Sequence, residues 1–168
     1  MSDIYCQRCG AATEERFADG KFRPVCPACG QVVYLDPKLA VAVVIERDGR
    51  LLLGRRGPTT AQAGRWSFPA GFVERGERVE DAARREAAEE TGLRVTLGPL
   101  LGLYSTTGET VVLAVYAAAM GAGEPSADDD LTELAWFAPD ELPELAFPHD
   151  IQILADWQAR QLPDRDSG

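Results

Sequence analysis

The sequence predicts an α/β fold, a sandwich of helices packed on a β-sheet, preceded by a small cysteine-rich module. Three observations predict it. All four cysteines lie within the first thirty residues. Beyond them, short strand-like runs are mixed with two helical segments, which is typical of an α/β sandwich. The 168 residues are enough for one sizeable core and too few for two full domains.

The cysteines form two matched pairs, Cys6-x-x-Cys9 and Cys26-x-x-Cys29. Sixteen residues separate the pairs, which lies within the range of four-cysteine zinc sites. Gly10 and Gly30 follow the pairs, and glycine tolerates the positive φ of a tight turn whose N–H groups point at sulfur. Zn²⁺ prefers four such soft ligands in a tetrahedron. We therefore predict a zinc ribbon over residues 1–34.

Two disulfides or a redox-active C-x-x-C are the alternatives for these cysteines. The polar N-terminus does not resemble a signal peptide, which disfavours disulfides, and the matching of the pairs disfavours a redox role. Four thiolates leave no position for water, so the predicted zinc is structural and supplies folding energy to a ribbon with little core. A dimer contact, a substrate contact and a simple appendage all stay open as its role.

The next segment reads as a hairpin followed by a loop. Residues 39–46 are apolar and β-branched, as in a buried strand, and residues 47–50 contain an Asp-Gly turn signal. The return strand begins at residues 51–53. Residues 57–64 read as a loop, and residues 66–72 as a short apolar stretch that Pro69 and Gly71 interrupt.

Residues 79–91 are helical by composition, with acids near the start and Gly92 at the end. Arg78, at the N-cap position, is a poor capping residue. The remaining predicted elements are strands 97–104, 111–119 and 134–137, an acidic loop 121–130 and a closing helix 148–161. These elements define a second domain over residues 35–162, followed by a flexible tail at residues 163–168.

Charge and hydropathy exclude several classes of protein. The formal net charge of −10 argues against a protein that mainly grips nucleic acid, because that task needs a basic surface. No run approaches the ~18 apolar residues of a membrane span. We expect a cytoplasmic protein with a small-molecule partner, and an acidic surface is compatible with a phosphate substrate when divalent cations are bound.

The helix at residues 79–91 carries acids on its inward side. Val79, Ala82 and Ala83 mark the buried face, and Glu86 and Glu90 continue the same stripe. Buried acids are costly unless something compensates them, and Mg²⁺ or Mn²⁺ would do so through carboxylate ligands. The alternative is a solvated acidic face.

A fixed pattern across this helix favours the metal. Its specified positions are Gly71-x5-Glu77-x7-Arg85-Glu86-Ala87-x-Glu89-Glu90-x-Gly92-Leu93. The pattern resembles the Nudix box, G-x5-E-x7-R-E-U-x-E-E-x-G-U, in which U is aliphatic, and every fixed position matches. The resemblance implies a Nudix α/β/α sandwich with a mixed sheet, and a loop–helix–loop site that binds Mg²⁺ or Mn²⁺ on a pyrophosphate.

The resemblance also implies roles for single residues. The metal ligands would be Glu86, Glu89 and Glu90, with the carbonyl of Gly71 as a further ligand. Glu77 would support the site, and Arg85 would hold the box together by pairing with an acid such as Glu77. One box glutamate, or an acid from a later loop, would take the proton of the attacking water. The reaction implied is hydrolysis of a phosphoanhydride.

Segments around the box resemble the zinc-ribbon ADP-ribose and FAD pyrophosphatase-like group. They are Tyr34-x-Asp36-Pro37-Lys38, Gly64-x-Trp66-x-x-Pro69-Ala70-Gly71, Trp136-Phe137, Asp140-Glu141-Leu142-Pro143 and Leu145-Ala146-Phe147. The NADH pyrophosphatases, which also carry a ribbon, have a Pro- and aromatic-rich motif where this chain has Pro99 to Tyr104. The resemblance implies ADP-ribose or FAD as substrate and a homodimer. NADH, nucleoside triphosphates and nucleotide sensing without cleavage are the alternatives.

Other residues are candidates with open alternatives. Asp130 is a further metal ligand or part of a solvated acidic loop, and Glu133 supports a strand. Arg55, Arg56 and Arg65 bind phosphate or are simple surface charges.

The aromatic candidates beside the box have alternatives as well. Trp66 and Phe68 stack a base or, as we favour, pack in the core. His149, the only histidine, is expected to be structural or exposed.

Overall fold

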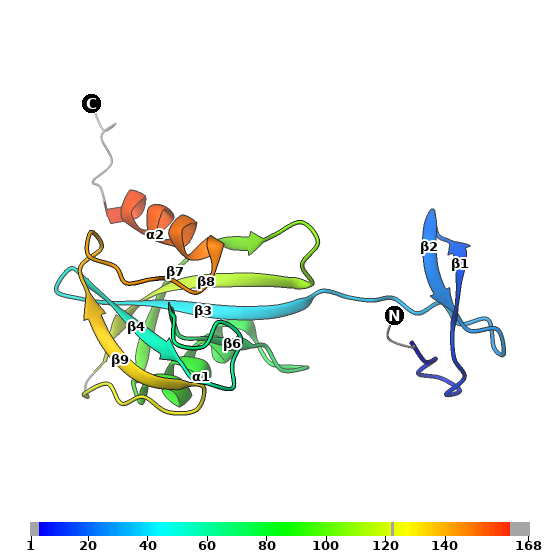
Figure 1. Ribbon diagram of the computed structural model, residues 1–168, viewed down its shortest axis with the longest axis horizontal. Helices are drawn as coiled ribbons and strands as arrows, with labels where there is room; N and C mark the ends of the chain where they lie inside the picture. The colour runs from blue at the N-terminus through cyan, green and yellow to red at the C-terminus, as the bar shows by residue number, and fades with distance from the viewer. Residues whose placement is uncertain (1–3, 122, 162–168) are drawn as a thin grey trace. The chain divides into compact units, whose positions relative to one another are not determined.

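The computed structural model describes residues 4–121 and 123–161. The chain forms two compact units that divide between Pro37 and Lys38 (Figure 1). The proposed tail at residues 163–168 lies outside the described residues. No helix of the described segments is long and apolar enough to cross a membrane.

The first unit is built on one hairpin and two cysteine turns. Its strands are β1 (Glu14–Ala18) and β2 (Lys21–Val25), which pair antiparallel. In each cysteine turn the glycine N–H returns to the carbonyl of the first cysteine, Gly10 to Cys6 at 2.8 Å and Gly30 to Cys26 at 3.0 Å. Both glycines have positive φ, as the turn signal predicts.

The second unit contains a mixed seven-stranded sheet. Its main path runs β5-β4-β3-β8-β7, while β6 pairs with β3 and β9 with β4. The pairing of β3 with β8 is parallel and the others are antiparallel. The strands are β3 (Lys38–Arg47), β4 (Arg50–Arg56), β5 (Trp66–Ser67), β6 (Ala70–Phe72), β7 (Val95–Ser105), β8 (Val111–Met120) and β9 (Leu131–Phe137).

Two helices cover opposite faces of this sheet (Figure 1). They are α1 (Val79–Thr91) and α2 (Pro148–Gln161). The central strand β3 is apolar from Leu39 to Ile45 because alternate side chains enter two cores. Val41, Val43 and Ile45 pack in the core that contains the alanines of α1. The predicted α/β/α sandwich with a mixed sheet is confirmed.

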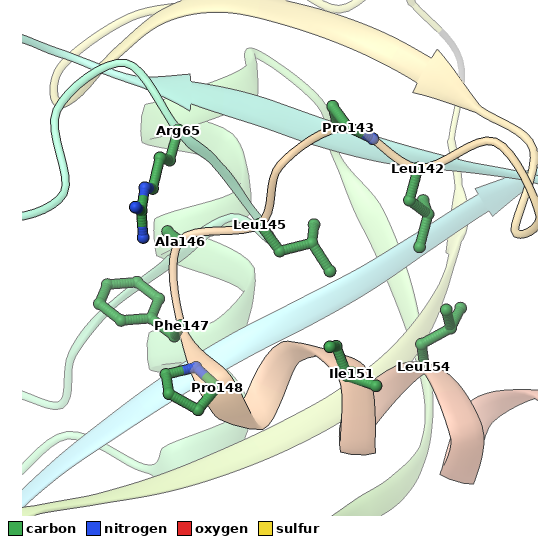
Figure 2. A pocket seen from close by; sticks show the side chains of 9 residues that line it. All are labelled: Arg65, Leu142, Pro143, Leu145, Ala146, Phe147, Pro148, Ile151 and Leu154. Carbon is green, nitrogen blue, oxygen red and sulfur yellow. The ribbon is translucent and has the colours of Figure 1, made fainter.

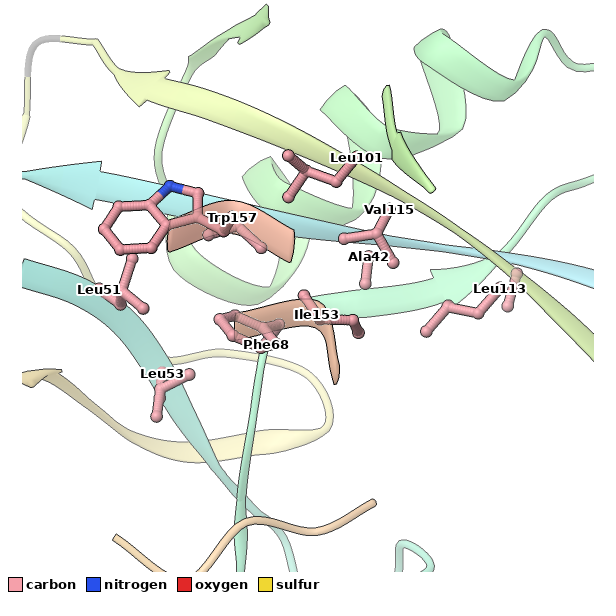
Figure 3. Close-up of a cluster of buried hydrophobic side chains, with 11 residues drawn as sticks. Ala42, Leu51, Leu53, Phe68, Leu101, Leu113, Val115, Ile153 and Trp157 are labelled. Atoms are coloured by element: carbon pink, nitrogen blue, oxygen red, sulfur yellow. The ribbon is translucent and has the colours of Figure 1, made fainter. Parts of the chain in front are cut away.

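The core beneath α2 holds the largest apolar side chains. Ile153 and Trp157 of α2 pack with Leu51 and Leu53 of β4, and with Phe68 (Figure 3). The burial of Phe68, which is 2% exposed, confirms its core role. Phe68 and Pro69 connect β5, which pairs with β4, to β6, which pairs with β3. The Pro69 carbonyl accepts the N–H of Val43 at 2.9 Å.

The ends of α1 are those that the sequence predicts. Arg78 is its N-cap and makes no capping hydrogen bond through its side chain. Gly92 ends the helix in the left-handed region, with φ 68°, and its N–H donates to Ala88. These ends fix which residues of the box are helical.

Candidate functional site

Helix α1 buries two of the glutamates of the box. Glu86 and Glu90 are 8% and 3% exposed and share the inward face of the helix with Ala82 and Ala83. The backbone N–H of Ala70, in β6, donates to Oε2 of Glu90 at 2.8 Å. The buried side of α1 is therefore acidic at the point where it meets β6.

These buried carboxyls resist ionisation in the absence of a cation. Burial raises the pKa of Glu90 to about 8, and the charges of Glu86 and Asp130 add to the rise. The Ala70 N–H and the charge of Arg56 oppose it. Burial also raises the pKa of Glu86. Such a pair suits a divalent cation, which would compensate both charges.

Gly71 is the residue of β6 that faces Glu86. A Cβ built on Gly71 would overlap the carboxyl group of Glu86, so only glycine leaves space for that side chain. The strand thus forms a cradle for the carboxylate, and the fixed glycine of the box has a steric cause.

Arg85 ties the loop before α1 to the helix. Its Nε and Nη2 donate to the two carboxylate oxygens of Glu77 at 2.9 and 3.0 Å, and Nη2 also donates to the carbonyl of Phe72 at 3.0 Å. The expected pair of Arg85 and Glu77 is therefore present. The Arg85 hydrogen bond and the N–H of Glu74 lower the pKa of Glu77 to about 2.

Glu89 lies outside the buried pair. Arg85 Nη1 donates to Glu86 at 2.7 Å and to Glu89 at 2.9 Å, and the Glu89 side chain is half exposed. Within residues 4–121 and 123–161, the one cluster of three or more side chains gathered tightly enough to share a metal is that of the cysteines. The sequence predicts three carboxylates on one side of the helix, whereas the structure turns two inward and leaves Glu89 half exposed at the edge of that face, where it pairs with Arg85 at i,i+4.

The acidic loop before β9 lies against the end of α1. The N–H groups of Ser126 and Asp128 donate to the carbonyls of Thr91 and Glu90, at 2.9 and 3.2 Å. The charge of Asp130 raises the pKa of Glu90, and that of Asp129 raises the pKa of Glu86. Asp130 is exposed and belongs to this neighbourhood, and the sequence analysis did not single out Asp129.

The three candidate arginines have different surroundings. Arg55 pairs with Glu133 at 3.5 Å and Arg65 with Glu144 at 3.0 Å, and all four side chains are well exposed. The charge of Arg56 lowers the pKa of Glu90, so this guanidinium lies close enough for its charge to act on a buried acid of the box. The structure thus distinguishes Arg56 from the other two.

Aromatic residues extend from Arg56 to the start of α2. The guanidinium carbon of Arg56 lies 5.1 Å from the centre of the Phe147 ring, and Phe147 stacks on His149. Trp66 packs edge-on against Phe137, with ring centres 4.9 Å apart. In the sequence, Phe147 stands out only as part of a motif, and Asp150 was not among the predicted site residues. Pro148 followed by an acid two residues later, a helix-start signal, could have indicated this corner.

The four cysteines of the first unit form one cluster. Their Sγ atoms all lie within 4.8 Å of one another, and all four cysteines are free. Cys6 and Cys26 are buried, whereas Cys9 and Cys29 are exposed. Four sulfurs converging on one point fit a tetrahedral zinc ion and not two separate disulfides.

Family models account for both units. The NUDIX domain model matches residues 36–157, and the Nudix N-terminal model, a zinc ribbon, matches residues 5–35. The chain belongs to the Nudix family. The resemblance of the box is thereby confirmed, together with that of the ribbon.

Several Nudix relatives are similar over most of the chain. An ADP-ribose pyrophosphatase of Methanocaldococcus jannaschii is 40% identical over 129 residues, which cover 74% of this chain and 75% of that protein. An NAD-capped RNA hydrolase NudC of Chromobacterium violaceum is 34% identical over 152 residues, 89% of this chain and 56% of the relative, so the chain spans about half of it. A NUDIX hydrolase structure from Nitrosomonas europaea has a TM-score of 0.85 at 27% identity, and the match covers 94% of this chain and 91% of that one.

Proposed function

We propose that this Nudix protein hydrolyses the pyrophosphate bond of a nucleoside diphosphate linked to another moiety, with ADP-ribose or FAD as the substrate. The observation that carries the proposal is the buried pair of Glu86 and Glu90 within a complete box, with Gly71 leaving space for Glu86 and the Ala70 N–H bound to Glu90. A box kept for nucleotide sensing alone would have no need of costly buried acids. The M. jannaschii relative supports ADP-ribose.

The site would hold Mg²⁺ or Mn²⁺ through Glu86, Glu89, Glu90 and the Gly71 carbonyl, with Asp130 as a further ligand. Bound there, the ion supplies charge neutralisation on the diphosphate and lowers the pKa of the attacking water. For Glu89 to join, its carboxylate must exchange Arg85 for the ion, which the exposed position of Glu89 permits.

The other residues of the box and its surroundings hold the loop before α1 and orient the substrate and the attacking water. Arg85 and Glu77 fix the loop between β6 and α1, and one box glutamate accepts the proton of the water. Arg56 donates to the substrate phosphates. Arg55 and Arg65 would have to leave their surface ion pairs with Glu133 and Glu144 to do the same.

The proposal also includes a structural zinc ion and a cytoplasmic location. Zn²⁺ on the four cysteines would stabilise the ribbon without taking part in hydrolysis. Reduced thiols gathered on one metal fit a cytoplasmic setting. We also propose a homodimer, which size-exclusion chromatography with light scattering would reveal.

A second candidate substrate class is NADH or the NAD cap of RNA. The resemblance to the NudC of C. violaceum, over a span that includes the ribbon, favours it. The residues Pro99 to Tyr104, in β7, differ from the motif of the NADH enzymes and favour ADP-ribose or FAD instead.

A substrate panel tests the proposal. The zinc-loaded full chain is incubated with ADP-ribose, FAD, NADH, diadenosine polyphosphates and nucleoside triphosphates, each with Mg²⁺ and with Mn²⁺. We expect the highest kcat/KM for ADP-ribose or FAD and none after chelation of the divalent ion. Nucleotide binding without any hydrolysis would contradict the proposed hydrolase activity and indicate a nucleotide-sensing module instead.

A further inference from the structure

The four cysteines of the first unit differ in their access to solvent. Cys6 and Cys26 are 2% and 0% exposed, whereas Cys9 and Cys29 lie at the surface. In each C-x-x-C pair the first cysteine is therefore the buried one and the second the exposed one. A zinc ion held by all four sulfurs would have one side protected by the ribbon and one side open to small reagents in solvent.

The backbone N–H groups around the cysteines follow the same division. Each buried sulfur is faced by two of them, which for Cys6 belong to Arg8 and Cys9. Within the described residues each exposed sulfur is faced by one, which for Cys9 belongs to Ala11. An N–H group that faces a thiolate withdraws electron density from the sulfur and makes it a weaker nucleophile. The exposed sulfurs are therefore both the more accessible and the more nucleophilic members of the cluster.

Each exposed sulfur lies close to a buried sulfur of the other pair. The Sγ atoms of Cys9 and Cys26 are 3.4 Å apart, and those of Cys29 and Cys6 are 3.7 Å apart. A disulfide bond is ~2.0 Å long, so the shorter of these gaps closes with a shift of about 1.4 Å. A sulfur that is oxidised at the surface thus has a second thiolate within reach, and the shorter distance favours the link from Cys9 to Cys26.

The second unit offers an oxidant few targets. It contains no cysteine, and its methionine, Met120, is partly buried at the end of β8, with Nη1 of Arg47 at 3.8 Å from the sulfur. The pocket of about 430 Å³ beside α2 is lined by apolar side chains and Arg65, and none of these lining residues contains sulfur (Figure 2). A mild oxidant should therefore act first on the cysteine cluster.

We propose that the exposed Cys9 and Cys29 make the ribbon a modification site for hydrogen peroxide, with a disulfide between Cys9 and Cys26 as the first product. A cysteine that coordinates a metal is deprotonated, and oxidation selects thiolates that solvent can reach. Formation of the disulfide releases the zinc ion, so the ribbon has a reduced form with metal and an oxidised form without it. The inference goes beyond the proposed hydrolysis and does not depend on it.

The oxidation takes place in two steps. The Cys9 thiolate attacks one peroxide oxygen and the O–O bond breaks, which leaves a sulfenic acid on Cys9 while the other oxygen takes up a proton and leaves as water. The Cys26 thiolate then attacks the Cys9 sulfur and the S–O bond breaks, so that the hydroxide takes up a proton and leaves as a second water. The two sulfurs together lose two electrons, which the peroxide gains. The two thiolates that remain do not complete a tetrahedral set, so Zn²⁺ leaves with its oxidation state unchanged.

Zinc release and disulfide mapping test the proposal on the zinc-loaded full chain. The protein is treated with hydrogen peroxide, released zinc is followed with a chromogenic chelator, and disulfides are located by mass spectrometry after free thiols are blocked. We expect zinc release to parallel the appearance of the Cys9–Cys26 link, and a reductant with added zinc to restore the bound ion. A first disulfide within one C-x-x-C pair would overturn the proposal. Zinc that stays bound while peroxide oxidises Met120 would do the same.

Histidine at the exposed positions separates reactivity from loss of the metal site, because imidazole also binds zinc but forms no disulfide. Cys29→His leaves Cys9 and Cys26 intact, so peroxide should release zinc as it does from the unmodified chain. When Cys9→His is combined with Cys29→His, the two thiolates that remain are buried and zinc should stay bound. Equally fast release from the single and the double variant would contradict the proposal. If the double variant binds no zinc, the position of the first disulfide in the unmodified chain still decides.

Discussion

At the residue scale, the site depends on how little space surrounds Glu86. Its carboxyl group occupies the volume beside Gly71 that any larger residue would fill. The two residues belong to different elements, so the fit joins β6 to α1. Activity should therefore be sensitive to single atoms at this contact.

Gly71→Ala is expected to lower kcat by about 100-fold, because a carboxylate displaced by about an ångström no longer meets its ion in the required geometry. Gly98→Ala, in β7 and remote from the box, is the matched control, with its nearest contact at 3.3 Å. Steady-state kinetics and thermal unfolding of both variants check this. Equal kcat for the two variants would contradict the steric role of Gly71.

Glu90→Gln should lower kcat by more than the ~100-fold that loss of a supporting partner costs, because it removes a proposed ligand. The amide oxygen can still accept the Ala70 N–H, and a buried amide has no ionised form whose desolvation costs free energy. We therefore expect the melting temperature to stay unchanged or to rise. Retained turnover with intact folding would refute the assignment.

At the element scale, two local devices position the chemistry. Arg85 joins the loop between β6 and α1 to the helix through Glu77 and the Phe72 carbonyl. Asp150 joins the corner before α2 to that helix. In both cases a side chain forms hydrogen bonds to backbone groups near the start of a helix. Loss of either side chain should therefore cost more stability or activity than loss of a surface ion pair.

Arg85→Lys is expected to lower kcat/KM by 10- to 100-fold, roughly the cost of losing a supporting partner of a metal ligand. Lysine cannot reproduce the fork that meets Glu77 with two nitrogens. Arg84, one residue away on the same helix, pairs with exposed Asp81. Arg84→Lys should therefore have little effect on kcat/KM. Comparison of kcat/KM for the two variants gives the answer, and similar losses would argue against a special role for Arg85.

Asp150 should make stability depend on pH. Burial raises its pKa from 3.8 to about 6, although the Phe147 N–H and the charge of Arg56 oppose the rise. His149 is the other titratable neighbour. Between these pH values the folded chain binds the proton more tightly than the unfolded chain, so this group's contribution to stability is largest below about pH 4 and falls as pH rises to 6.

Asp150→Asn removes that dependence while it keeps an oxygen for the Phe147 N–H. The free energy of unfolding of the variant, relative to the unmodified chain, should therefore increase from pH 4 to pH 6. Chemical denaturation of both proteins at several pH values measures it. A difference that is constant or decreases with pH would show that folding does not raise the pKa of Asp150.

At the scale of the whole molecule, two units have different sources of stability. The second unit has two apolar cores, one on each face of its sheet. The first unit, Met1–Pro37, is held by a single hairpin and the cysteine cluster, with Phe17 and Phe22 exposed. A module of this size with so little core would depend on a metal bound by its cysteines.

Removal of zinc by a chelator is expected to unfold the first unit and leave the second folded. Hydrogen exchange should then speed up over residues 4–37 and stay unchanged over the sheet strands. Cys26→Ser, at a buried ligand position, should give the same pattern. Loss of protection in β3 and β8 on chelation would show instead that the ribbon supports the fold of the second unit.

The sequence by itself determined both helices of the second unit and the inward position of two box glutamates. Helix α1 has the predicted bounds because Gly92 stops it and the helical spacing of its small residues marks its face, both of which are local properties of the sequence. The cysteine pairs predicted their own cluster because turn geometry is also local. The spacing of Glu86 and Glu90 sufficed to place both on the inward side.

Only the tertiary structure decided which side chains meet across elements. Arg55, Arg56 and Arg65 are all candidates in the sequence, yet of the three it is Arg56 whose guanidinium lies over the Phe147 ring and whose charge acts on Glu90. Glu89 has the right spacing but lies half exposed, paired with Arg85. Contacts between residues about ninety positions apart depend on sheet order and register, which no local pattern encodes.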